Sequence, residues 1–443
     1  MYDNLPPSLK PFYKISEPNQ PISICETLLL VCKGDSCMEG LGEIYLEWLP
    51  KPQIKFKLRL EDCSLVFVEH CVLLKIPEFN LSVDALIAIN QHFNNISGRS
   101  KIEIIGRIRN SISIGCQNSF SYITFHIANF YDFFGSCPAV DKTEKISINQ
   151  RGILENDEWK VTIDQLKSTT ESIKYLESKG GFQITHVGKI EKISREEFSV
   201  EDSQDILEMI GIFLSFIRGL KIAPLLPVGF DESSEVVWQD WGFYNINPWS
   251  MGPYSWAIDH SGTVKAIDFE TIFSGFSDFW KKHRDSVRAL IHWYTASNIS
   301  AAGAEGSIIL QQTALELIST LYLVEERKVF ENHCFEKMQA SRKINRLLEH
   351  TNVPQSIPAS LSNLTTYSES IENKEQRYNG PRTVVNVRNN IVHSSRENRQ
   401  SFASLPAATI IETKRLSLHY LERVLLYIFN YEGRYIDRFN LEE

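Results

Sequence analysis

The chain has 443 residues, of which 43% are hydrophobic and 23% charged, and its formal net charge is −9. This much apolar side-chain mass excludes disorder as the main state, and the length suits two or three domains. The longest apolar runs, such as 27–32 and 425–429, are far shorter than the roughly 20 residues that span a bilayer. The first residues also lack the apolar stretch of a secretory signal. We therefore expect a cytoplasmic protein without membrane contact.

The cysteine pattern disfavours both a disulfide framework and a structural zinc site. Seven of the eight cysteines lie in the first third of the chain, Cys334 stands alone, and no CxxC pair occurs. We expect reduced, buried thiols, no bound metal and no cofactor.

Between about residue 20 and residue 195 the sequence is typical of short strands. Apolar residues alternate with period two over 54–60, 64–74, 101–109 and 121–130, and turn-rich segments separate these runs. One helix is predicted over 162–181, where a helical spacing ends at a glycine pair. Strands at this spacing favour a β-sandwich or a barrel. We predict an N-terminal antiparallel β-sandwich-like domain over residues 1–200.

After residue 196 the apolar period becomes helical. The sequence predicts helices over 202–220, 277–298, 305–328, 334–350, 360–378, 383–393 and 405–430. Residues 222–274 are less regular, with several prolines and four tryptophans that either pack in a core or stack on bases: Trp238, Trp241, Trp249 and Trp256. We predict an α+β protein whose second domain, 201–443, is an all-α helical bundle with an irregular Trp-rich insertion at 222–274.

The segment 380–393, GPRTVVNVRNNIVH, is the most informative in the chain. On a helical wheel its valines and Ile391 form an apolar stripe, and Arg388 falls inside that stripe. A guanidinium buried without a partner costs several kcal/mol, so this conflict between pattern and residue indicates a functional site. Asn389 and His393 lie on the opposite, polar face of the ideal wheel.

The surrounding sequence is basic. Residues 374–415 carry eight lysines and arginines against three glutamates, so a polyanion would be attracted here. Arg382, Arg396 and Arg399 flank the segment and are candidates for holding RNA phosphates. Glu316 and Asn390 are candidates for supporting the site, Glu316 by pairing with Arg388.

The spacing Arg388-Asn389-x-x-x-His393 resembles the R-x4-6-H signature of the HEPN (higher eukaryotes and prokaryotes nucleotide-binding) ribonucleases. A β-rich N-terminal domain followed by helices with this motif resembles, more closely, the ApeA family of anti-phage defence proteins. The resemblance implies a C-terminal HEPN domain that cleaves RNA, with transfer RNA as a plausible substrate, during abortive infection triggered by a phage component. The β domain would then regulate the nuclease or sense the infection.

The residue types suit that chemistry. Imidazole titrates near neutrality and serves as an acid or a base, whereas arginine holds a phosphate and stays charged. Arg388, Asn389 and His393 are therefore the candidate catalytic residues. One histidine cannot act as acid and base at once, so we expect a homodimer, or a higher even-numbered oligomer, with a composite site.

Other interpretations remain open. The bare spacing is weakly specific, since Arg327 and His333 also match it by chance. Arg388 and His393 would then be a structural arginine and a helix-capping histidine. In that case the helical domain would be a non-catalytic RNA- or nucleotide-binding module or a scaffold, with a degenerate HEPN domain.

Overall fold

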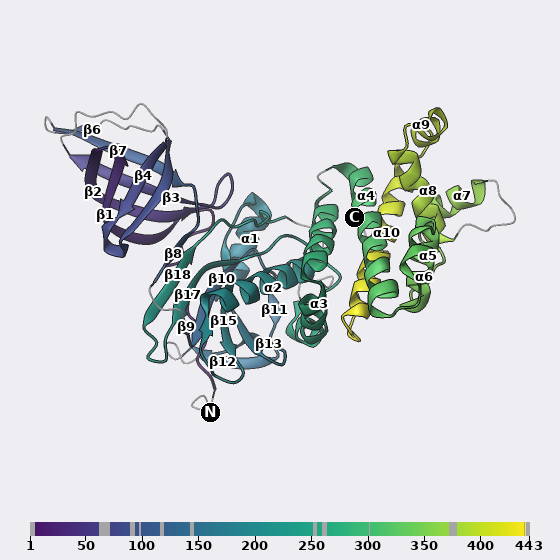
Figure 1. The fold of residues 1–443 in the computed structure, drawn as a ribbon, viewed down its shortest axis with the longest axis horizontal. Coiled ribbons are helices and arrows are strands. Elements are labelled where there is room, and N and C mark those ends of the chain that lie inside the picture. Colours follow the sequence, from purple (N-terminus) through teal and green to yellow (C-terminus); the bar gives the residue numbers. More distant parts are fainter. Residues whose placement is uncertain are drawn as a thin grey trace. The chain divides into compact units, whose positions relative to one another are not determined.

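A computed structural model describes residues 5–61, 71–88, 94–96, 99–115, 119–141, 146–250, 255–258, 264–300, 302–371, 379–437 and 439. The chain forms two compact units. The first holds the residues up to 251 except 154–156 and 211–221, and the second holds those residues and 252–443. The first unit is rich in strands and the C-terminal part is helical, as the sequence predicts (Figure 1).

The first sheet closes on itself, because β3 pairs with both β2 and β7. Around the ring the order is β3-β2-β1-β4-β5-β7, and β6 pairs with β7 outside it. The bounds are β1 Ile22–Lys33, β2 Ser36–Glu47, β3 Gln53–Glu61, β4 Cys71–Ile76, the 3-10 turn η1 Pro77–Phe79, β5 Leu81–Ala88, β6 Asn94–Ile96 and β7 Arg99–Ile108. This part is a small barrel, so the sandwich-like prediction is wrong here.

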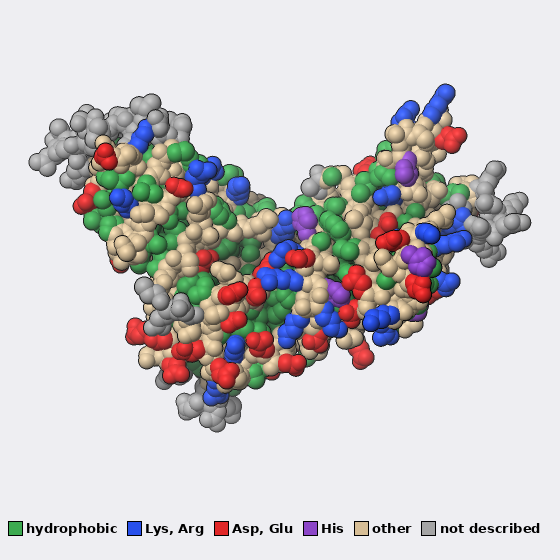
Figure 2. All heavy atoms as spheres, viewed as in Figure 1, with side chains coloured by type: hydrophobic (Ala, Val, Ile, Leu, Met, Phe, Trp, Pro, Cys, Tyr) green, Lys and Arg blue, Asp and Glu red, His purple; other side chains and the backbone are tan. Residues whose placement is uncertain are grey.

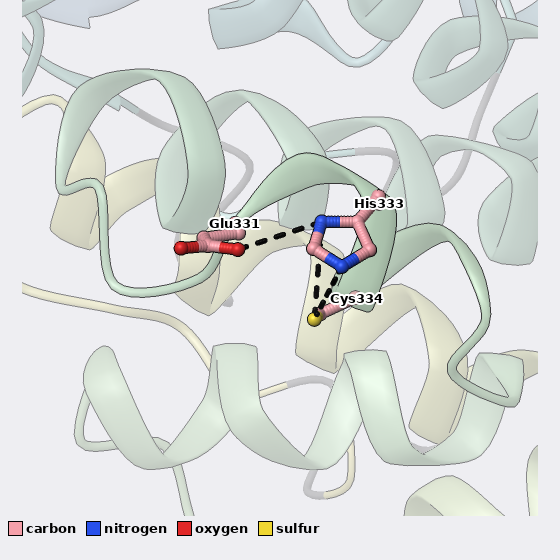
Figure 3. Close-up of side chains that lie close together, drawn as sticks. All are labelled: Glu331, His333 and Cys334. Carbon is pink, nitrogen blue, oxygen red and sulfur yellow. Dashed lines mark hydrogen bonds and ion pairs between the residues drawn. The ribbon is translucent and has the colours of Figure 1, made fainter.

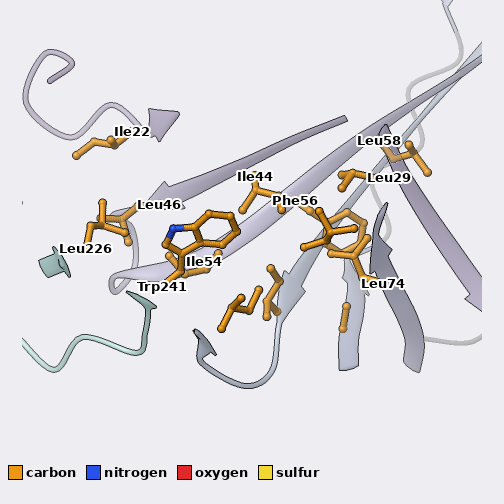
Figure 4. Close-up of a cluster of buried hydrophobic side chains, with 14 of the residues drawn as sticks. Ile22, Leu29, Ile44, Leu46, Ile54, Phe56, Leu58, Leu74, Leu226 and Trp241 are labelled. Carbon is orange, nitrogen blue, oxygen red and sulfur yellow. The ribbon is translucent and has the colours of Figure 1, made fainter. Parts of the chain in front are cut away.

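Side chains fill the barrel, as a ring this small requires. In β3 the predicted alternation is confirmed: Ile54, Phe56 and Leu58 are buried, whereas the lysines between them are partly exposed. Figure 4 shows these side chains together with Leu226 and Trp241 from the second sheet. The core of the first unit is therefore continuous from the barrel into that sheet. Most of the predicted strand 64–74 lies outside the described residues.

The second sheet is antiparallel in the order β12-β13-β14-β15-β10-β17-β18-β8. Its strands are β8 Ile112–Ile114, β10 Tyr122–Ala128, β12 Cys137–Asp141, β13 Ile146–Glu155, β14 Trp159–Gln165, β15 Ile184–Lys192, β17 Pro224–Phe230 and β18 Val236–Trp241. The short strands β9 Ser119–Phe120 and β16 Phe198–Ser199 pair with each other, and β11 is Phe133–Phe134. Helix α1, Thr169–Lys179, is shorter than the helix predicted over 162–181, whose first residues belong to β14.

Residues 222–251 were predicted to be part of an insertion in the helical domain, and the structure places them elsewhere. They belong to the first unit, because β17 pairs with β10 and β18 pairs with β17. The tryptophans of 222–274 are at most 8% exposed, which makes them core residues and leaves no stacking surface for bases.

The cysteines also differ from expectation. Cys32 and Cys37 form a disulfide, because the β1–β2 hairpin places them directly opposite each other. The other described cysteines, Cys25, Cys71, Cys137 and Cys334, are free, as expected of reduced thiols, but they are partly or fully exposed, so the predicted burial is wrong for them.

The second unit contains the later helices. They are α3 Ala266–Ile299, α4 Gly303–Thr320, the π-helix η2 Leu321–Glu326, α5 Asn332–Glu336, α6 Ala340–His350, α7 Ser362–Ser370, α8 Gly380–Val392, α9 Arg396–Ala403 and α10 Ala407–Ile428. Helix α2, Val200–Arg218, enters this unit at Gly211, and β19 is Val264–Lys265. Helix α8 packs against α4, α6, α9 and α10. Residues 372–378 of the helix predicted over 360–378 lie outside the described residues.

Within the described part of the chain, one helical stretch is long and apolar enough to cross a membrane by length and composition alone. It is 303–326, formed by α4 and η2, and 61% of its apolar 18-residue window is buried inside the protein. Core helices of bundles have the same property.

Candidate functional site

The start of α8 is fixed by contacts from two other parts of the helical unit. The Asn379 side chain accepts a hydrogen bond from the Arg382 amide (3.2 Å), which caps the helix. The Gly380 amide donates to the carbonyl of Gln355 (2.8 Å). A Cβ on Gly380 would lie 1.9 Å from the Tyr420 hydroxyl of α10, so only glycine fits this position. These contacts set where the motif lies.

The buried face of α8 holds the helix against its neighbours. Val384 and Val387 are at most 1% exposed, and Val387 belongs to a small cluster with Ile308 of α4 and Ile410 of α10. A second set of contacts is polar. The Tyr367 hydroxyl of α7 donates to Asn386 (2.6 Å) and accepts from Asn390 (3.1 Å).

Asn390 was predicted to support the site. Its side chain is 7% exposed and is bonded to Tyr367, so it positions α8 against α7.

Arg388 is half-buried, as its place in the apolar stripe suggests. One terminal nitrogen donates to the Asn389 side chain at 3.3 Å. Its Nε is buried and has no hydrogen-bond partner in the described part of the chain. The predicted pairing with Glu316 is not present, since Glu316 accepts from Gln312 (2.8 Å) within α4.

His393 lies just beyond the helix. Its backbone is extended (φ −87°, ψ 131°), although its amide still donates to the Asn389 carbonyl at 3.0 Å. The helical wheel placed His393 on the polar face of α8 on the assumption that the helix includes this residue. Because α8 ends at Val392, that placement does not hold. The imidazole is exposed and contacts no other described side chain by a hydrogen bond or ion pair.

The flanking arginines divide into two groups. Arg396 and Arg399 open α9 directly after the motif and are exposed, and Figure 2 shows Lys and Arg side chains (blue) gathered at that helix. The Arg399 guanidinium donates to the Ser394 carbonyl. Arg382 lies at the other end of α8, about 16 Å from His393 along the axis at 1.5 Å per residue. The structure thus brings Arg388, Asn389, His393, Arg396 and Arg399 to one end of α8, away from Arg382.

The chance match at Arg327 and His333 leads to a different arrangement. His333 lies beside Glu331 (3.5 Å) and Cys334 (3.3 Å), and all three side chains are exposed (Figure 3). Their ligand atoms lie within 4.8 Å of one another, close enough for one metal ion. Among the described residues no buried side chain bonds to any of the three, unlike the usual ligands of a metal centre.

Sequence reasoning missed the residues that place the motif. The Asn-Gly-Pro run at 379–381 is a readable signal for a helix start, since asparagine caps and proline fits the first turn. Tyr367 has no such signal, because its contact with α8 depends on the packing of α7.

Comparisons with known proteins match most of the chain. Residues 116–252 match the family model of the YopA central domain, and residues 280–443 match that of the YopA C-terminal domain. The SPbeta prophage-derived uncharacterized protein YopA of Bacillus subtilis (strain 168) is 23% identical over 424 residues, which is 95% of this chain and 92% of that protein. No solved structure matches. These matches name neither ApeA nor a HEPN ribonuclease, and the predicted resemblance stays a prediction.

Proposed function

We propose that the protein is a metal-independent endoribonuclease of the HEPN type, with Arg388, Asn389 and His393 as catalytic residues. The observation that carries the proposal is the state of Arg388: a half-buried guanidinium whose Nε has no partner. A buried donor left unsatisfied costs about 1–3 kcal/mol, and a phosphate oxygen would supply the missing acceptor. His393 is exposed at the same end of α8, where it can reach a bound RNA.

The reaction follows from these groups. The ribose 2′-oxygen attacks phosphorus and the 5′-oxygen leaves, giving a 2′,3′-cyclic phosphate and a 5′-hydroxyl. One imidazole takes the proton of the 2′-hydroxyl and another supplies a proton to the leaving oxygen. Arg388 and Asn389 stabilise the charge that develops on the phosphoryl oxygens. Arg396 and Arg399 hold neighbouring phosphates.

Two imidazoles require two chains, because each chain contributes one His393. Exposed apolar side chains close to the motif support an interface here: Val392 is 38% exposed and Ile411 is 39% exposed. A second copy related by a twofold axis would cover both residues and bring a second motif to the same phosphate. The active form is therefore a homodimer or a higher even-numbered oligomer.

The cellular role proposed is abortive infection in the cytoplasm, with transfer RNA as the substrate and a phage-derived component as the trigger. It rests on the resemblance to ApeA. The β-rich unit would sense the trigger or restrain the nuclease. The B. subtilis relative is named as prophage-derived.

The test compares the purified wild type with Arg388→Ala and His393→Ala. We expect each variant to lower the RNA cleavage rate at least about 100-fold, because His393→Ala removes a general acid or base and Arg388→Ala removes a donor to the developing charge. Arg346→Ala and His333→Ala, both at exposed residues away from the motif, should cleave at the wild-type rate. EDTA should not change the rate of any of these proteins.

Thermal unfolding of the same variants separates the alternatives. Variants that stay folded and lose cleavage support the nuclease. If Arg388→Ala unfolds instead, the role of Arg388 is to stabilise the fold. Full growth arrest during phage infection with His393→Ala would favour a non-catalytic RNA-binding module. The basic end of α8 and α9 is the feature that favours this second candidate.

A further inference from the structure

A cavity of about 580 Å³ opens in the helical unit, apart from the motif. Its walls come from α3, from η2 and Arg327 after it, and from the end of α10 with the residues that follow. The motif helix contacts the starts of α4 and α10 through Val387, whereas the cavity lies at their far ends. It spans the usual size of a small-molecule site.

Two helices are distorted at this cavity. Helix α3 leaves helical geometry at His283 (φ −132°, ψ 35°), and α4 continues as the π-helix η2. Both irregularities meet at Glu326, which accepts from His283 Nε2 at 2.9 Å and from Lys282 at 3.1 Å. Such distortions cost helical hydrogen bonds and are frequent at functional sites.

The third wall is held close by a glycine. A Cβ on Gly275 of α3 would lie 2.0 Å from the carbonyl oxygen of Phe429, so the two segments can approach only with glycine there. Asn430 then adopts a left-handed backbone (φ 56°), which turns the chain around the cavity. Asp278, one turn after Gly275, and Glu432 both line the space.

The charges of the lining leave two carboxylates unmatched. Lys282 is paired with Glu326, and the Arg327 guanidinium lies over the Tyr322 ring at 5.7 Å. Burial raises the pKa of Glu326, but the hydrogen bonds from His283 and Lys282 outweigh it and hold that pKa below its usual value. Asp278 and Glu432 have no hydrogen bond or ion pair in the described residues.

Aromatic rings complete the lining. Phe279, Tyr322, Tyr427 and Tyr431 face the space, and the rings of Tyr322 and Tyr427 lie edge to face at 6.4 Å. Ring faces attract cations, and Arg327 over Tyr322 is one instance already within this wall. Carboxylates without partners, beside aromatic faces, are the groups that recognise an organic cation.

We propose that this cavity binds an elongated organic amine of the polyamine type. Its ammonium groups pair with Asp278 and Glu432, and its methylene chain lies against the tyrosine rings. An anionic ligand is disfavoured, because the lining carries three carboxylates against Lys282 and Arg327 and the lysine is already paired. This inference is independent of the proposed nuclease, since it concerns binding at a separate site.

Isothermal titration of the full-length protein with spermidine tests it. We expect wild-type binding, and roughly tenfold weaker binding for the double variant Asp278→Asn/Glu432→Gln, because two ion pairs at exposed carboxylates are lost. Asp285→Asn is the matched control: it removes a carboxylate from the same helix that is paired with Arg288 (3.2 Å) and does not line the cavity. Tyr427→Leu should weaken binding severalfold.

Two results would overturn the inference. One is spermidine affinity that is equal in the wild type and the double variant. The other is AMP, titrated in parallel, binding more tightly than spermidine and losing its affinity in Arg327→Ala, which would assign the cavity to an anion. Because the readout is binding, a failed nuclease test leaves this result unaffected.

Discussion

Two fully buried histidines in the first unit are held neutral by their surroundings. His126 accepts a hydrogen bond from the Phe12 amide at Nε2 (3.2 Å), and its Nδ1 lies 3.2 Å from the Leu225 carbonyl, so the proton is on Nδ1. Burial lowers the pKa of His126 to about 4 and that of His186 to about 3. Protonation of His126 would also destroy the contact with Phe12.

The first unit should therefore lose stability in mild acid. The unfolded chain takes up protons near pH 6.5, whereas the folded chain does so only near pH 4 or below, so the free energy of unfolding falls as the pH falls between these values. We expect a loss of about 1.5 kcal/mol per histidine between about pH 6.5 and pH 5. Urea unfolding followed at several pH values measures it.

Replacing one of the two histidines measures its contribution to the pH dependence of the free energy of unfolding. His186→Gln should remove about half of the pH dependence, while the same change at the exposed His350 should leave the dependence as it is. An unchanged pH dependence in His186→Gln would show that this residue is not the neutral, buried group described.

At the scale of single residues, the sequence predicts which side chains are buried better than it predicts where they point and which partners they bind. The wheel places Arg388 in the apolar stripe, and the structure buries half of it. The position of His393 depends on the end of α8 at Val392, and no local sequence pattern predicts that end. The missing Glu316 contact has a similar cause, because Gln312 one turn away binds that carboxylate instead.

Helix α8 depends on its first residue. Gly380 lies so close to the Tyr420 hydroxyl that Gly380→Ala must push α8 away from α10. We expect the variant to lose about 1–3 kcal/mol of stability, as overpacking does, and to cleave RNA more slowly because the motif shifts. Chemical unfolding and cleavage rates of the purified variant measure the two effects.

A second change tests the cause. Tyr420→Phe removes the atom closest to the new methyl group, so the double variant should regain part of the stability. Gly242→Ala is the control, since its Cβ would lie 3.2 Å from the end of the Asp240 side chain and at ordinary contact distance, 3.7 Å, from the Tyr244 ring. Equal stability of Gly380→Ala and the double variant would exclude the proposed clash.

The period of the apolar residues predicts which segments are strands and which are helices, but it does not predict where a helix is distorted. The predicted strand over 54–60 and the helix over 202–220 are confirmed by β3 and α2. The segment 162–181 combines a strand and a helix, because its first four residues, 162–165, belong to β14 and pair with β15 in the sheet. The π-helix η2 and the kink at His283 are joined by the contact between His283 and Glu326, and the apolar period of the sequence predicts neither distortion.

At the scale of the whole molecule, pairing between strands that are distant in the sequence determines features that local sequence patterns do not predict. Barrel closure needs β3 to meet β7, about 45 residues later in the chain. Residues 222–251 join the first unit through β10, which precedes them by about 100 residues. The sequence predicts the order of a β-rich part and a helical part correctly, but not the point where one ends.

The assembly proposed for the active protein also belongs to this scale. A composite site makes cleavage a property of the pair of chains, since each supplies one imidazole. Removing His393 from one chain should then disable its partner as well. A site within one chain would leave the partner active.

Mixed dimers test this claim most directly. Wild type and His393→Ala, carrying different tags, are coexpressed in varied ratios, and the total RNA cleavage rate is measured at constant total protein. If both imidazoles act on one phosphate, total activity follows the square of the wild-type fraction, so an equal mixture retains about a quarter of it. Activity that falls in direct proportion, to about half in an equal mixture, would contradict a shared site.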